Sequence, residues 1–139
     1  MKMPDLIHPI FFAPCGVDCM VCYRHLAARN PCPGCRSGEA GKPAHCRKCA
    51  IKSCLFEKGL SFCLECAAFP CKAVKNLDRS YRSRYQASLI ENSGAVRAQG
   101  MRAFLEQERN RFICKSCGGV ISLQDHLCSE CGNAALDIY

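Results

Sequence analysis

The sequence predicts a small α+β protein whose fold is organised by metal ions. Fifteen cysteines lie among 139 residues, most of them in pairs separated by two residues. A central stretch without cysteine has apolar residues at helical spacing, and two matching cysteine knuckles near the C-terminus leave room for a β-hairpin. We therefore expect an irregular cysteine-rich domain with short helices at residues 1–71, a helical connector at 72–111 and a zinc ribbon at 112–139.

The eleven cysteines of residues 1–71 can be grouped in several ways, and spacing alone does not choose between them. One zinc site is expected from two pairs separated by nine residues: Cys19, Cys22, Cys32 and Cys35. A second is expected from cysteines that follow: Cys49, Cys54, Cys63 and Cys66. Three cysteines remain, which would exchange with these sets, bridge two ions or complete a further site with His25: Cys15, Cys46 and Cys71.

An iron–sulfur cluster is the alternative for this half of the chain. The segment Cys15-Gly-Val-Asp-Cys19-Met-Val-Cys22 has the three-cysteine spacing found in radical S-adenosylmethionine enzymes. The chain is too short for the barrel of those enzymes and has no strand–helix repeats. A cluster held by these three cysteines and a later one, in electron transfer or redox sensing, stays open beside zinc.

Helices are expected at two places in the chain. A short one should run from about Cys49 to Lys58, with Gly59 in the left-handed position after its last turn. In the connector, Ser88 and Glu91 have the spacing of a capping box, which starts a helix at the next residue. Gly100 should end that helix, and a further helix should follow it directly.

The C-terminal knuckles give the most specific local signal. Each is a CxxC pair followed by glycine, and ten residues separate the pairs. Val120 and Ile121 suit strands of a hairpin. One closed tetrahedral zinc site is expected from four cysteines, with a rubredoxin-like iron site as the alternative: Cys114, Cys117, Cys128 and Cys131. A closed site leaves no position for an activating water, and no catalytic set of residues stands out elsewhere, so we expect a non-catalytic protein. From the expected cysteine sets we expect about three zinc ions, or four if His25 takes part.

The positive charge of the chain says less about partners than it first suggests. The formal net charge of +7 counts every cysteine as neutral. Four thiolates around Zn²⁺ have a net charge of −2, so three such sites lower the total to about +1. We therefore expect a protein partner, with nucleic acid as the alternative. That alternative rests on one segment in which basic and aromatic residues alternate: Arg79, Tyr81, Arg82, Arg84 and Tyr85.

No secretory signal is recognisable at the start of the sequence, and no apolar run reaches the length of a membrane span. Thiolates that bind metal need a reducing compartment, so a cytoplasmic protein without membrane contact is expected.

Several segments together resemble a family of bacterial and archaeal cysteine-rich proteins of unknown function, often described as zinc-binding. They include Pro14-Cys-Gly-Val-Asp-Cys19, Cys32-Pro-Gly-Cys35, Phe62-Cys-Leu-Glu-Cys66 and Cys114-Lys-Ser-Cys-Gly-Gly119. The resemblance implies metal binding and a shared architecture, with no assigned activity. It also implies that four further cysteines belong to the common pattern, with Cys46 an addition: Cys15, Cys49, Cys54 and Cys71.

Overall fold

The structure is a computed structural model that describes residues 1–135. These residues form five α-helices, the first of which is a single turn: α1 (Ala44–Arg47), α2 (Ala50–Lys58), α3 (Lys72–Tyr85), α4 (Leu89–Gln99) and α5 (Met101–Phe112). Three short 3-10 helices lie in the cysteine-rich part: η1 (Pro9–Phe11), η2 (Cys19–Val21) and η3 (Cys63–Glu65). No helix in residues 1–135 is both long and apolar enough to cross a membrane.

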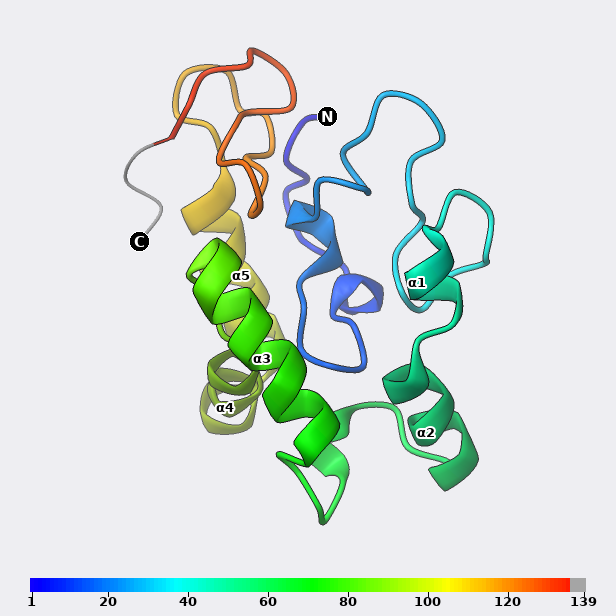
Figure 1. Ribbon diagram of the computed structural model, residues 1–139. Coiled ribbons are helices and arrows are strands. Elements are labelled where there is room, and N and C mark those ends of the chain that lie inside the picture. The colour runs from blue at the N-terminus through cyan, green and yellow to red at the C-terminus, as the bar shows by residue number, and fades with distance from the viewer. Residues whose placement is uncertain (136–139) are drawn as a thin grey trace.

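The longer helices gather on one side of the molecule. Figure 1 shows α3, α4 and α5 together, with α1 and α2 on the opposite side and the N-terminal segment between the two groups. α4 packs against both α3 and α5. The C-terminal loops continue from the end of α5 and lie near the N-terminus (Figure 1).

One apolar core joins the three parts of the chain. Phe12 and Val21 from the N-terminal segment are fully buried in it, together with Phe112 of α5 and Val120 of the C-terminal loops. The rings of Phe12 and Phe104 meet edge to face with their centroids 5.5 Å apart. Burial of each such side chain stabilises the fold by about 1.5–3 kcal/mol. The cysteine-rich loops therefore rest on a core that the helices and the C-terminal loops help to build.

The helix ends follow local sequence signals, and these predictions are confirmed. α2 ends at Gly59, whose φ of 67° is left-handed. The Leu60 N–H then donates to the Leu55 carbonyl at 3.0 Å, which satisfies a carbonyl at the end of the helix. α4 begins after Ser88, whose Oγ accepts a hydrogen bond from the Glu91 N–H at 3.1 Å.

The predicted β-hairpin is not present in residues 1–135, so the α+β class is wrong for this part of the chain, which is mostly helical. Single antiparallel bridges stand where strands were expected, among them Ile121–Cys128 and Leu127–Ala134. The segment between the knuckles turns too soon to form a ladder: the Ser122 Oγ accepts from the Gln124 N–H, and His126 has a φ of 59°. The predicted third unit reached residue 139, and residues 136–139 lie outside the described part.

Candidate metal centres

The four cysteines of the C-terminal knuckles converge on one point. Their sulfur atoms all lie within 4.8 Å of one another. The Cys114 and Cys131 sulfurs are 3.8 Å apart, and those of Cys117 and Cys128 are 3.5 Å apart. Sulfurs bound to a tetrahedral zinc at about 2.3 Å stand about 3.8 Å from one another. No other set of three or more His, Cys, Asp or Glu ligand atoms in residues 1–135 is drawn together this closely.

Two tight turns aim these sulfurs. In the first knuckle the Gly118 N–H donates to the Cys114 carbonyl at 2.8 Å, and in the second the Gly132 N–H donates to the Cys128 carbonyl at 2.9 Å. Backbone N–H groups of Cys117 and Ser116 point at the Cys114 sulfur and hold the pKa of that thiol below its usual value, at about 6. The thiolate is the form that binds metal, so the turn prepares this ligand.

Gly119 fits the backbone closely around the second knuckle. A Cβ at this position would lie 2.6 Å from the Cys128 sulfur and 2.8 Å from the Glu130 Cγ. The sequence shows a glycine directly after each CxxC pair, and the further need for glycine at position 119 appears only in the structure. The donor set and this cradle together fit a four-thiolate metal ion such as Zn²⁺.

The C-terminal unit also holds the first residues of the chain. The Val120 N–H donates to the Met1 carbonyl at 2.9 Å, and the Met3 N–H donates to the Gly118 carbonyl at 2.9 Å. The amino group of Met1 pairs with the Glu130 carboxylate. The metal knuckles and the N-terminal segment therefore support one another.

Seven of the eleven N-terminal cysteines line one cavity, and the other four lie outside its lining. The first group, which lines this cavity of about 480 Å³, consists of Cys15, Cys19, Cys22, Cys32, Cys35, Cys46 and Cys49. This cavity takes in all four members of the first expected zinc site, and adds Cys15, Cys46 and Cys49. We call it the thiol cavity.

Cys19 and Cys35 lie at the best-defined contact of the thiol cavity. The Cys35 N–H points at the Cys19 sulfur at 3.5 Å. A hydrogen bond from the Cys19 thiol holds the pKa of Cys35 below its usual value, at about 7, and the nearby Lys42 ammonium acts in the same direction. Lys42 is only 3% exposed, and its Nζ donates to the carbonyls of Cys35 at 3.2 Å and Ser37 at 2.6 Å. Sequence analysis missed this buried cation, because nothing local marks a lysine for burial.

The second group consists of Cys54, Cys63, Cys66 and Cys71. Burial, the largest effect, raises the pKa of Cys63 to about 11, and the other three thiols of the group and Cys49 act in the same direction. Lys58 at the end of α2 donates from its Nζ to the Cys66 sulfur at 3.3 Å. The expected second set has Cys49 in place of Cys71. Cys49 lies on the wall of the thiol cavity, and Cys63 interacts electrostatically with both Cys49 and Cys71, so that expected set stays a prediction.

His25 also lines the thiol cavity. Its Nδ1 lies 2.6 Å from the Cys32 carbonyl oxygen, which only accepts, so Nδ1 holds the proton in this contact. The ring stacks at a tilt on Phe11 with the centroids 4.9 Å apart. A neutral imidazole held this way keeps its lone pair on Nε2, which is the arrangement that metal-binding histidines commonly have.

The arginine–tyrosine segment of α3 faces two different surroundings. Tyr81, Arg84 and Tyr85 line the thiol cavity, and the two tyrosine rings lie edge to face at 5.2 Å. Arg82 is engaged within the protein: its Nε is 2.7 Å from the buried Asp78 carboxylate. A nucleic acid bound to this segment would have to share or replace these contacts.

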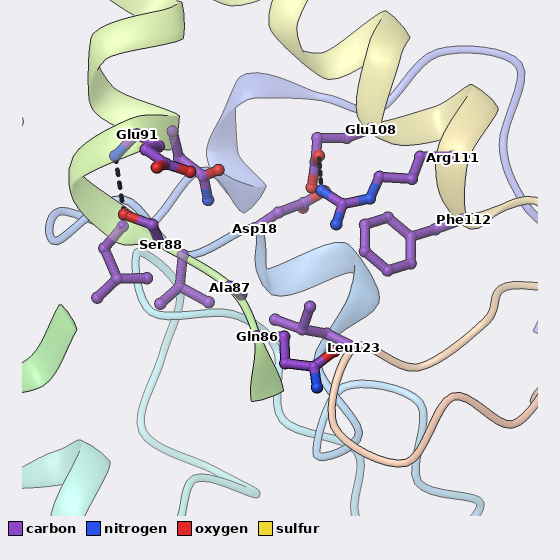
Figure 2. A pocket seen from close by; sticks show the side chains of 12 residues that line it. Asp18, Gln86, Ala87, Ser88, Glu91, Glu108, Arg111, Phe112 and Leu123 are labelled. Atoms are coloured by element: carbon purple, nitrogen blue, oxygen red, sulfur yellow. Dashed lines mark hydrogen bonds and ion pairs between the residues drawn. The ribbon is translucent and has the colours of Figure 1, made fainter. Parts of the chain in front are cut away.

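A small pocket of about 70 Å³ has no cysteine in its lining and shares Val17 with the thiol cavity. Figure 2 shows Asp18 and Glu108 on one side of it with the Arg111 guanidinium next to them. Burial raises the pKa of Asp18 to about 8 and of Glu108 to about 7, and each carboxyl is at most 6% exposed. The Arg111 Nη1 is 3.7 Å from the Glu108 carboxylate. The Oδ2 of Asp18 has no hydrogen-bond partner among residues 1–135. Neither carboxyl was singled out by the sequence.

Comparison with known proteins gives one family match, in the N-terminal cysteine-rich part of the chain. Residues 11–76 match the model of a family described as a protein of unknown function, DUF3795. That segment is slightly less than half of the chain and contains every cysteine of the thiol cavity and of the second group. The expected similarity of this cysteine-rich chain to a family of unknown function is confirmed at that level. No curated protein and no solved structure matches the chain.

Proposed function

We propose that this chain is a zinc-binding protein of non-catalytic type that serves as a protein-interaction or regulatory module. The observation that carries the proposal is the convergence of four cysteine sulfurs in the C-terminal knuckles. Four thiolates complete the coordination of zinc, so no position is left for a reacting water or substrate. An ion in this place would act on structure rather than on chemistry.

The surroundings of the C-terminal knuckles support a structural role for the metal. The knuckles hold Met1 and Met3 through backbone hydrogen bonds, and Val120 and Ile121 beside them are buried in the shared core. Fixing the knuckles thus fixes the N-terminal segment as well. Free energy of metal binding becomes free energy of folding when the ligands are brought together only in the folded state.

Two large apolar side chains support a protein partner. Phe56 on α2 is 87% exposed, and Leu6 in the N-terminal segment is 68% exposed. Single exposed apolar residues are ordinary on protein surfaces, so these two side chains indicate the surface that a partner would cover and do not identify the partner. The partner in this proposal is a protein that covers Phe56.

Metal analysis of two variants tests the zinc assignment. Cys117→Ser should lose one zinc per chain relative to the wild type and lower the thermal midpoint. Ser116→Ala, an exposed neighbour in the same knuckle, should change neither quantity. Full zinc content in Cys117→Ser would overturn the structural-zinc proposal. Phe56→Ala should leave the zinc content and the thermal midpoint unchanged. It is the variant in which binding of a protein partner should be lost.

A further inference from the structure

The thiol cavity contains more ligands than one metal ion uses. Seven cysteines from three loop segments face the same space: residues 15–22, 32–35 and 46–49. One tetrahedral ion takes four thiolates, so three would remain without a metal. Cysteines of this density in a reducing environment are better explained as ligands than as isolated core residues.

The spacing of these thiols differs from that of the C-terminal knuckles. In residues 1–135 the knuckle sulfurs alone form a set in which all ligand atoms lie within 4.8 Å. Within the cavity the Cys35 N–H contacts the Cys19 sulfur, and no three of the seven sulfurs all lie within 4.8 Å of one another. Thiolates that share one ion must stand close together, whereas thiolates bound to different ions of a bridged centre stand farther apart.

Positive charge surrounds the cavity. Lys42 is buried next to Cys35, and Arg24, Lys52 and Arg84 lie on the cavity wall. The Lys52 Nζ also forms an ion pair with the Glu39 carboxylate oxygen, 3.1 Å away. A centre with several thiolates and bridging sulfurs has net negative charge, and cations and N–H donors around the sulfurs stabilise it.

We propose that the thiol cavity holds one polynuclear metal–thiolate centre, with ligands drawn from all three loop segments. This inference goes beyond the proposed function, which needs only the C-terminal ion. It replaces separate single-ion sites by one shared centre, and it gives Cys15, Cys46 and Cys49 a common role. Bridged iron with inorganic sulfide and bridged zinc are two compositions of the same centre, and the experiment separates them.

The test uses the full chain, purified without oxygen. Metal content, acid-labile sulfide and the visible spectrum are measured for the wild type, Cys19→Ser and Cys46→Ser. Ser116→Ala, a change at an exposed position that removes no thiol, and Cys117→Ser in the knuckles are the matched controls. Cys19→Ser should lower the metal content by more than one ion per chain, and Cys46→Ser should lower the content of the same metal centre. Cys117→Ser should lower it by a single ion, from the C-terminal knuckles. Iron with sulfide and a brown colour identifies an iron–sulfur composition, and a colourless protein with zinc identifies zinc–thiolate.

A second measurement does not depend on the variants folding. X-ray absorption at the edge of the bound metal in the wild type should show metal–metal scattering, which the single C-terminal ion does not produce. Sulfur neighbours alone, with loss of just one ion in Cys19→Ser and none in Cys46→Ser, would overturn the proposal. Failure of the C-terminal zinc test leaves this result untouched, because the two metal centres have separate ligands.

Discussion

Gly16 packs directly against the backbone of Leu89. A Cβ on Gly16 would lie 2.7 Å from the Leu89 carbonyl oxygen and 2.9 Å from the Ser93 Oγ, and the φ of Gly16 is 105°. This contact joins the loop that begins at Cys15 to the first turns of α4. The side-chain amide of Asn92 adds a hydrogen bond to the Gly16 carbonyl at 2.9 Å.

Substitution of Gly16 by alanine should therefore destabilise the whole fold. The positive φ alone costs about 1–3 kcal/mol for a residue other than glycine, and the steric overlap adds to it. Gly94→Ala is the matched control, because Gly94 lies in the interior of α4 with nothing within 4 Å of the added Cβ. That change should stabilise the protein by about 0.5–1 kcal/mol. Urea unfolding of both variants measures the difference, and equal stabilities would contradict the close packing at Gly16.

Gly119→Ala should weaken metal binding at the C-terminal knuckles without removing a ligand. The new methyl group would overlap the Cys128 sulfur, so the sulfur has to move away from its position around the ion. Competition with a chromophoric zinc chelator should show faster and more complete loss of one ion than in the wild type. Gly38→Ala, where nothing lies within 4 Å, should match the wild type. Unchanged zinc retention in Gly119→Ala would show that the second knuckle tolerates the shift.

Stability should fall with rising pH because of Glu108. Burial raises the folded-state pKa of this carboxyl to about 7, above the value of about 4.3 expected when unfolded, while Arg111 opposes the shift and the buried Asp18 carboxyl faces it. The folded protein thus holds the proton more tightly. This contribution is complete below about pH 4.3 and is lost as the pH rises through about 7.

Thermal midpoints of the wild type and Glu108→Gln between about pH 5 and pH 8, a range that spans the folded-state pKa of about 7, check this expectation. The variant should lose less stability than the wild type over that range. Glu106→Gln removes an exposed carboxylate from the same helix and should follow the wild-type curve. Parallel curves for the wild type and Glu108→Gln would show that Glu108 is ionised in the folded state at all these pH values.

Arg82 should matter for stability more than its neighbours on α3. Its guanidinium contacts the buried Asp78 carboxylate at 2.7 Å and the Ser88 Oγ at 2.9 Å, and so ties α3 to the start of α4. Arg82→Ala leaves Asp78 with bonds from Ser88 and from the Ile90 N–H, so the expected cost is moderate, about 1 kcal/mol.

Arg79→Ala, an exposed position on the same helix, is the control for Arg82→Ala and should be neutral within about 0.5 kcal/mol. Denaturant unfolding compares the two variants. Binding of single-stranded nucleic acid, measured in parallel at several salt concentrations, should be weak in both. Tight binding that Arg79→Ala reduces would instead favour the nucleic-acid alternative.

Sequence reasoning succeeded where short-range chemistry decides the outcome. The end of α2 at Gly59 and the start of α4 after Ser88 were predictable, because a left-handed glycine and a side-chain cap act within a few residues. The hairpin was not, since the bend at His126 and the early turn at Ser122 depend on how this segment packs onto the core. Nor did any local signal mark Asp18 or Glu108 for burial.

By itself the sequence determined the C-terminal ligand set, because two short CxxC turns each fix two sulfurs and ten residues between them allow closure. Only the tertiary structure decided which N-terminal cysteines share the thiol cavity. It placed Cys15, Cys46 and Cys49 in the lining with the first expected set, while Cys63 interacts electrostatically with both Cys71 and Cys49. The physical reason is that the walls of the cavity come from the N-terminal loops and from α1, α2 and α3. Their positions follow from packing on a shared core, which residue spacing does not encode.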